Sequence, residues 1–348
     1  MSMVKGYEKD EMGAVDRILA TATGKSTDRI PIFPMLDSNP SKLMNLTIEE
    51  YYSKAENVIK GQEILQEKLN LDYVSSFYYL AIESEIFGMK TLFFEEGSPN
   101  TGEPIVKDIN YFLENDIPEI NEHPSYKKIL DTTKALAERY KGKKPILAVE
   151  TGPFSFPSLL MGAPAWFEAI LMNPEKVNEV LKYSINFIKE WANGMLEAGA
   201  DIIVLVDGLA TATSIPIDMF ESFIIPSFQK ITKDLGVPVI FYTAGGDMLP
   251  FAKEFALTGA IGVFPSANDD LAEFKKASEN KYMILGNLNN LELGDWPLDF
   301  MESIIKESIE IGKPGGKFVL ATQHMIPHNV SLEKVAKLIE ISLKYAYY

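Results

Sequence analysis

Polar side chains that could act in catalysis gather in residues 283–330, near the carboxyl end of the sequence. One apolar run in this segment ends at Asn287, and a second ends at Gln323 and His324. His328, another of the three histidines in the chain, follows shortly after. Because the carboxyl ends of parallel strands face one side of an α/β sheet, we expect these groups to share one site.

Two acids also end apolar runs, Glu150 and Asp207. A buried carboxylate is costly unless it is paired or bound to a metal, so both are candidates for catalysis, with capping or loop bracing as the alternative. Tyr242 and His324 end two further runs and can donate a hydrogen bond to a ligand, which makes them catalytic candidates as well.

Residues that follow the remaining runs are candidates for substrate binding: Asp37, Phe77, Tyr78, Phe154, Asn287 and Asn289. The rings among them suit a planar organic ligand. Ordinary packing at the mouth of a sheet explains any single ring equally well.

Short apolar runs alternate with helical patterns along the chain, which is typical of a parallel α/β sheet. Eight runs are predicted as strands, at residues 30–33, 71–76, 146–150, 202–207, 239–242, 261–264, 283–286 and 318–321. Helices are predicted at residues 10–24, 47–69, 125–140, 164–171, 174–198, 216–235, 249–258, 271–278 and 297–311, and a closing helix is expected to start at His328. Eight such units favour a closed (β/α)₈ TIM barrel over an open doubly wound sheet.

We predict a single barrel domain over residues 1–348 with an N-terminal helical extension. The irregular segment around 82–116 is interpreted as a loop or hairpin excursion over one face of the barrel. Hydrophobic residues make up 46% of the sequence, which is enough to fill a large core.

The net charge of −16, with no basic cluster to offset it, disfavours nucleic acids and anionic lipids as partners, although solubility alone also explains it. The chain has no cysteine, which excludes disulfides, thiolate–zinc sites and cysteine nucleophiles. No apolar run reaches the roughly 18 residues of a membrane span. The charged N-terminal segment lacks the apolar core of a signal peptide, so we expect a cytoplasmic protein.

Several short motifs occur in the order found in one known family. They are DRIPI at 28–32, GPF at 152–154, PVIFYTAGG at 238–246, LGN at 285–287 and FVLA at 318–321. With these motifs the chain resembles the uroporphyrinogen decarboxylase superfamily over nearly its whole length. The resemblance implies a (β/α)₈ barrel that is either a decarboxylase or a corrinoid-dependent methyltransferase. The decarboxylases need arginines after the first strand, where this chain has Asp37 and no arginine, so porphyrinogen decarboxylation is disfavoured.

The resemblance also bears on a metal. Methylcobamide:thiol methyltransferases of the family hold zinc with one histidine and two cysteines, and the matching positions here are Tyr242, Ala244 and His324. Some family members that demethylate methoxylated aromatics are described with a zinc pattern Glu-x14-Glu-x20-His. This chain contains that pattern, and the zinc ligands it implies are Glu292, Glu307 and His328. A set chosen from the strand ends alone is Glu150, Asp207 and His324.

The expected function is therefore transfer of a methyl group from a small methoxylated aromatic to the cob(I)amide of a separate corrinoid protein, because the chain has no room for a cobalamin domain of its own. Cleavage of an aryl methyl ether needs an acid or a Lewis-acid metal at the departing oxygen. Two alternatives stay open: methylcobamide-dependent transfer to or from a thiol, an amine or another carrier, and a non-catalytic barrel that binds a small molecule. A homodimer is also left open.

Overall fold

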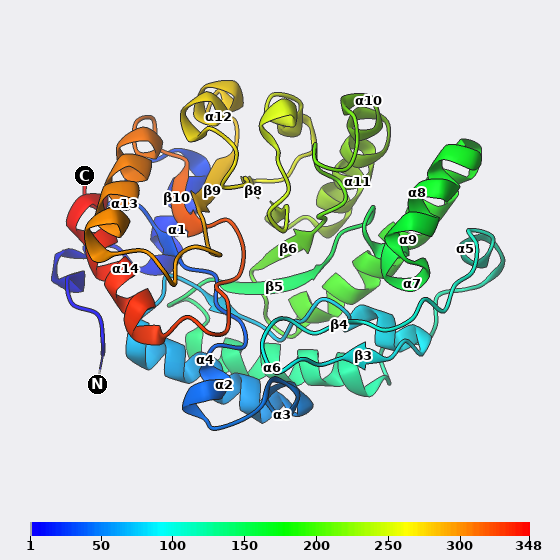
Figure 1. The fold of residues 1–348 in the computed structure, drawn as a ribbon, viewed down its shortest axis with the longest axis horizontal. Helices are drawn as coiled ribbons and strands as arrows, with labels where there is room; N and C mark the ends of the chain where they lie inside the picture. Colours follow the sequence, from blue (N-terminus) through cyan, green and yellow to red (C-terminus); the bar gives the residue numbers. More distant parts are fainter. Residues whose placement is uncertain (1) are drawn as a thin grey trace.

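The computed structural model describes residues 2–348, and its centre is an eight-stranded parallel sheet surrounded by helices (Figure 1). The strands are β1 (Ile32–Phe33), β2 (Val74–Ser75), β5 (Ile146–Thr151), β6 (Ile202–Val206), β7 (Val239–Tyr242), β8 (Gly262–Phe264), β9 (Met283–Leu288) and β10 (Phe318–Thr322). Their order is β1-β10-β9-β8-β7-β6-β5-β2, so the first two strands of the chain lie at the two ends of the sheet. All eight predicted strands and the barrel-type α/β fold are confirmed.

Helices follow nearly every strand. The α-helices are α1 (Ala14–Thr23), α2 (Pro40–Leu43), α3 (Ile48–Ser53), α4 (Ala55–Leu69), α5 (Tyr111–Glu114), α6 (Pro124–Tyr140), α7 (Phe156–Met161), α8 (Ala163–Met172), α9 (Pro174–Glu197), α10 (Ile217–Met219), α11 (Ile225–Leu235), α12 (Leu271–Ser278), α13 (Leu298–Gly312) and α14 (Leu332–Ala346). Shorter turns are η1 (Tyr7–Lys9), η2 (Glu83–Phe87), η4 (Leu249–Phe251) and η5 (Glu254–Leu257), and η3 (Phe220–Ile224) is a π-helical turn.

Some predicted helices differ in detail. The helix predicted at 47–69 is two helices, because Lys54 adopts an extended conformation between α3 and α4. The segment predicted at 216–235 contains the wide turn η3, which lies just before Pro226, a residue without the N–H that a regular helix needs. The helix predicted at 249–258 is wrong: single 3₁₀ turns occur there, the first of them fixed where Asp269 accepts the Leu249 N–H at 2.9 Å.

Alternation along β7 shows which side of each strand faces the helices. Phe241 stacks on Phe228 of α11 with ring centroids 4.7 Å apart, so it lies on the helix side. The next residue, Tyr242, points to the inner side, where its ring lies 5.4 Å from the ring of His324. Side chains along a strand point alternately to the two faces, and residues in register on neighbouring strands point to the same face. The orientation of Phe241 and Tyr242 therefore also gives the orientation of side chains on the neighbouring strands.

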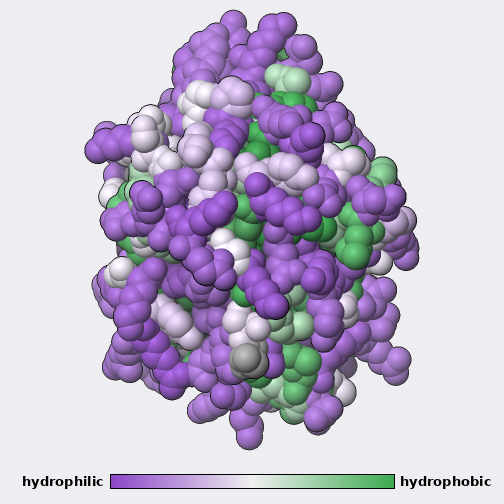
Figure 2. Space-filling view, turned by 90° about the vertical axis from the view of Figure 1, so that its left-hand side faces the viewer, coloured by the Kyte–Doolittle hydropathy of each residue, from purple (hydrophilic) through white to green (hydrophobic). Residues whose placement is uncertain are grey.

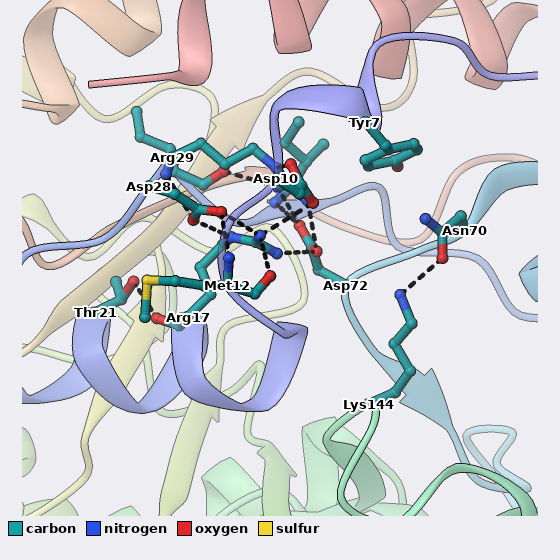
Figure 3. A network of polar contacts seen from close by, with 12 residues as sticks. Tyr7, Asp10, Met12, Arg17, Thr21, Asp28, Arg29, Asn70, Asp72 and Lys144 are labelled. Carbon is teal, nitrogen blue, oxygen red and sulfur yellow. Dashed lines mark hydrogen bonds and ion pairs between the residues drawn. The ribbon is translucent and has the colours of Figure 1, made fainter.

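Charged side chains, rather than a ladder of backbone hydrogen bonds, bridge β1 and β2 (Figure 3). The buried Asp72 carboxylate, just before β2, accepts hydrogen bonds from Arg29 at 2.7 Å, from Arg17 at 3.0 Å and from the Ile32 N–H of β1 at 2.9 Å. Asp28 and Asp10 complete the set through Arg17 and Arg29, at 2.8 and 2.7 Å. We call these five residues the seam cluster. It includes the start of the DRIPI motif and links the two end strands of the sheet, which are not paired with each other.

The segment predicted as an excursion contains a two-stranded hairpin, β3 (Thr91–Leu92) and β4 (Asn100–Thr101), whose tip includes Gly97 and Ser98. The two chain ends lie on one side of the molecule (Figure 1), where Arg29 pairs with Tyr347. That side is largely hydrophilic, with only small hydrophobic patches (Figure 2). Among residues 2–348, no helix has the length and apolar content needed to cross a membrane.

Candidate active site

A cavity of about 530 Å³ opens at the carboxyl ends of the strands, and we call it the mouth cavity. It is formed by the loops after β1, β7, β8, β9 and β10 and by the tip of the β3–β4 hairpin. Its lining residues are Asp37, Ser38, Gly97, Ser98, Ala244, Gly245, Asn268, Asn289, Asn290, Leu291 and residues 323–328. The cavity therefore lies where the sequence placed the site, and it contains His324, His328, Asn289 and Asp37.

Neutral polar groups dominate the lining of the mouth cavity. Four side-chain amides contribute to it, those of Asn268, Asn289, Asn290 and Gln323, together with two histidines. No lysine or arginine is among the lining residues, and Asp37 is the one carboxylate there. A cavity with this charge pattern favours a neutral ligand over an anion.

His324 presents a hydrogen-bond donor to the cavity. Its Nδ1 atom accepts from the Met325 N–H at 2.6 Å, and the same N–H also lies 3.0 Å from the Tyr242 hydroxyl. An Nδ1 atom that accepts is unprotonated, so in the neutral ring Nε2 carries the proton. Burial lowers the pKa of His324 to about 4, which keeps the ring neutral near pH 7. The result is a fixed imidazole N–H in the cavity wall.

Tyr242 supports this arrangement from below the cavity. It is 1% exposed and does not line the mouth cavity, and burial raises the pKa of its hydroxyl well above the usual value. Through the shared Met325 N–H it holds the loop that carries His324. Its geometry fits a positioning residue.

Asp37 follows β1 at the edge of the cavity. Its carboxylate accepts from the Ser38 N–H and from the Ser38 hydroxyl. Burial raises its pKa, and the Ser38 hydrogen bonds oppose this. A proton on this carboxyl group is therefore held more tightly than on an ordinary aspartate.

The predicted aromatic wall of the site is not formed. Phe77 and Phe154 are fully buried, where Phe77 packs on Tyr52 and Phe154 on Trp166. These rings fill space under the loops, so packing, the alternative interpretation, is the correct one. Tyr78 is buried below the mouth cavity.

The two predicted asparagines differ in position. The Asn287 amide donates to the carbonyls of Ser266 and Asp269, both at 2.8 Å, and braces the loop after β8. Asn289 lines the mouth cavity, while its Oδ1 accepts from the Leu291 N–H at 3.0 Å. Asn289 therefore keeps its amide N–H₂ group for a ligand.

Neither Glu150 nor Asp207 faces the cavity, contrary to the sequence prediction. Glu150 is in register with Leu205, and Leu205 is in register with the helix-facing Phe241, so Glu150 points toward the helices. Asp207 follows the inward-facing Val206 and accepts from the N–H groups of Phe154 and Ser155 at 3.1 and 2.7 Å. Burial raises the pKa of Asp207 to about 6. Its position matches loop bracing.

The predicted zinc ligands are not brought together. His328 lines the mouth cavity, and its Nε2 lies 2.9 Å from the Ser41 hydroxyl. It lies in the loop before α14 and not, as predicted, at the start of that helix. Glu292 and Glu307 line a different depression of about 340 Å³ beside α13. Glu307 is ten residues into α13, about 14 Å along its axis. Across residues 2–348, no three histidine, aspartate or glutamate side chains are grouped so that they could hold one metal ion. Neither the Glu–Glu–His set nor the strand-end set fits zinc, because the donors lie on different faces.

Glu83 is a buried acid near the site that the sequence did not indicate. Glu83 of η2 is 1% exposed, and its Oε1 accepts from the Thr151 N–H at 2.8 Å at the end of β5. It lies in the irregular segment 82–116, where no periodic pattern indicates which side chains are buried. Ser41, whose hydroxyl contacts His328, was not predicted either. It lies in α2, a helix too short to show a periodic pattern.

Fold and site together describe an α/β barrel of the uroporphyrinogen decarboxylase family, and the chain belongs to this family, whose model "Uroporphyrinogen decarboxylase (URO-D)" matches residues 14–345. Its relatives include corrinoid methyltransferases. The methylcobamide:CoM methyltransferase MtaA of Methanosarcina barkeri is 24% identical over 340 residues, which are 94% of this chain and 97% of the relative. A uroporphyrinogen decarboxylase of Koribacter versatilis is 23% identical over 322 residues, 86% and 88% of the two chains.

A solved structure shows the same fold. It is described as a methyltransferase from Methanosarcina mazei and superposes with a TM-score of 0.86, covering 96% of this chain and 99% of the other at 21% identity. The resemblance to the corrinoid-dependent methyltransferase branch of the family is thereby confirmed.

Proposed function

We propose that this protein is a corrinoid-dependent methyltransferase that takes a methyl group from a neutral methoxylated aromatic bound in the mouth cavity. The acceptor is the cob(I)amide of a separate corrinoid protein. The main support for a neutral ether as substrate is the His324 Nε2–H donor in a cavity whose lining has no lysine or arginine. The relationship to MtaA supports methyl transfer involving a corrinoid.

The reaction breaks the bond between the methyl carbon and the ether oxygen, and the electron pair of that bond stays on the oxygen. The partner's corrinoid supplies the nucleophile that takes the methyl group. This chain binds the ether and stabilises the charge that develops on its oxygen. A neutral imidazole N–H, fixed before the reaction, is suited to that task because it needs no reorganisation as charge appears.

The lining of the mouth cavity also favours a neutral aromatic ether over coenzyme M, the thiol named for the methyltransferase relatives. Coenzyme M carries a sulfonate, and an anion gains nothing from a cavity that holds Asp37 and no cation. A thiol must also lose its proton to become a nucleophile, for which zinc is the usual means, and the donor set for zinc is missing. The ether donor needs only a hydrogen-bond donor.

Single-turnover methyl transfer from 2-methoxyphenol to the cob(I)amide of a corrinoid protein tests the proposal. We expect His324→Ala to lower the rate by about 100-fold, the usual effect of removing one fixed donor to a developing oxyanion. His123→Ala is the matched control, since His123 caps α6 and accepts from the Ser125 N–H away from the cavity. Methylation of a thiol, with no transfer from any methoxyarene, would show that the substrate class is wrong. The cytoplasmic location stays a prediction from the sequence, and a homodimer stays open.

A further inference from the structure

Twelve buried side-chain polar atoms of residues 2–348 have no hydrogen-bond partner, and five of them belong to neighbouring residues between the mouth cavity and η2. They are the Tyr78 hydroxyl, the Thr151 hydroxyl, Oε2 of Glu83 and both carboxyl oxygens of Glu150. All four residues are at least nine-tenths buried. Buried polar atoms without hydrogen bonds are expensive, so a group of them calls for an explanation beyond packing.

Three of these residues lie close to one another. Glu83 accepts from the Thr151 N–H at 2.8 Å, which places its carboxyl group next to Thr151. The Thr151 side chain is near enough to Glu83 and to Tyr78 to lower the pKa of each, against the larger effect of burial. Thr151 faces inward, since it is in register with Val206 and Val206 with Tyr242. We call Glu83, Thr151 and Tyr78 the buried series. It leads from η2 to the inner side of the barrel at the end of β5.

A small cavity beside Tyr78 shares two lining residues with the mouth cavity. It has a volume of about 10 Å³, and its lining includes Tyr78, Ser76, Asp37 and Met325. That volume is about what the centre of one water molecule requires. Asp37 and Met325 also line the mouth cavity. Asp37 is thus the residue at which the buried series reaches the substrate site.

We propose that Glu83, Thr151, Tyr78 and Asp37 form an internal proton path that supplies the mouth cavity. The proposal rests on the proposed function, in which a phenolate leaves and must be protonated. The proton passes from the Asp37 carboxyl group to the phenolate oxygen. Asp37 regains one through a water in the small cavity and the Tyr78 hydroxyl, which is itself reprotonated from Glu83 by way of Thr151. Glu83 is recharged along the same path once the product leaves and the cavity is open to solvent.

An internal source is needed because docking of a corrinoid protein over the mouth would separate the reaction from bulk water. His324 is neutral and acts as a hydrogen-bond donor, so it does not provide the proton itself. Burial raises the pKa of Glu83 to about 7, which suits a group that holds a proton near neutral pH. The charged or titratable groups around Glu83 are Tyr78, Tyr79, Glu85 and Glu150, and those around Asp37 are Tyr51, Tyr52, Tyr73 and Tyr242.

Infrared spectroscopy of the purified protein tests the path without substrate or partner. We expect a carboxylic acid C=O band that titrates near pH 7, is missing in Glu83→Gln and shifts in Tyr78→Phe. Tyr282→Phe is the matched control, because its buried hydroxyl donates to the Ala252 carbonyl outside this region and its removal should leave the band unchanged. A wild-type protein without such a band, or a band that survives in Glu83→Gln, overturns the proposal whatever the methyl donor is.

Methyl-transfer kinetics test the link to the reaction. In Tyr78→Phe and Glu83→Gln we expect the single-turnover rate to fall at least about tenfold more for methoxybenzene, a poor leaving group, than for 4-nitromethoxybenzene, whose leaving group needs no proton. Equal losses with both donors would contradict proton delivery. If no methoxyarene reacts, the proposed function fails, and the infrared titration still decides whether the path exists.

Discussion

The seam cluster and the region below the mouth cavity both bury several ionisable groups, yet they are built in opposite ways. In the seam cluster, two arginines face three aspartates, and Asp72 alone accepts from both arginines and from the backbone of β1 (Figure 3). In the other region, Glu83 and Glu150 lie close to each other with three of their four oxygens unpartnered. A buried charge that is fully paired holds structure together, while buried acids left without partners indicate a group that is kept protonated for use.

The largest expected effect comes from breaking the seam cluster. Asp72→Asn removes a buried carboxylate that pairs with both Arg17 and Arg29 and that also anchors Ile32. We expect a loss of about 3–5 kcal/mol in the free energy of unfolding, measured with urea. Glu273→Gln, which removes an exposed partner of Lys276, serves as the control and should leave the midpoint unchanged. A variant at position 72 that is as stable as the wild type would mean that the cluster does not hold the two end strands together.

The two regions should also respond to pH in opposite directions. Burial alone would raise the pKa of Asp28 and Asp72, but their arginine partners outweigh it and lower both, so the stability they contribute is lost as pH falls below about 4. The pKa of Glu83 is raised to about 7, so its contribution is full below about pH 4 and is lost as pH rises through 7. The expected loss is about 3 kcal/mol between about pH 4 and pH 7, and Glu83→Gln should abolish this near-neutral slope but keep the slope below pH 4. A near-neutral slope that is unchanged in Glu83→Gln would show that another acid causes it.

A smaller effect is expected at Glu150, whose two oxygens have no partner and whose pKa is raised by burial and by the charge of Glu83. Glu150→Met replaces an unsatisfied acid with an apolar side chain of similar size on the helix side of β5. We expect a gain of about 1–2 kcal/mol in the free energy of unfolding. Methyl transfer should be unchanged, because Glu150 does not reach the mouth cavity. Loss of activity without loss of stability would restore the catalytic role that the sequence suggested.

Much of the fold could be predicted because its signal repeats along the chain. The strands of the parallel sheet lie in mostly buried, apolar runs bounded by polar residues, and the order of strands and helices leaves few topologies open. His324 could be predicted for the same reason, since it follows directly on the strand end. The seam cluster was visible as a motif, although its meaning, five ionised groups meeting across three segments, depends on contacts between residues far apart in the chain.

The wrong predictions have two causes. One is an error of a single residue at the end of a strand, and the other is that a spacing in the sequence does not fix which side chains meet in space. Strand β5 runs one residue beyond its predicted end, to Thr151, and alternation then turns Glu150 away from the site and Thr151 toward it. The spacing of Glu292, Glu307 and His328 matched a pattern, but a spacing does not state which face of α13 a side chain occupies. Glu83 had no signal at all, because its segment has no period.

In the proposed reaction, the mouth cavity binds a neutral methyl ether and His324 activates it. The most direct measurement compares single-turnover methyl transfer to cob(I)amide from 2-methoxyphenol and from 3-methoxybenzoate, which share the ether but differ in charge. The carboxylate of the benzoate finds no lysine or arginine in the cavity lining to replace its hydration, so the neutral donor should react at least about tenfold faster. Faster transfer from the anionic donor, or transfer only to a sulfonated thiol, would contradict the account.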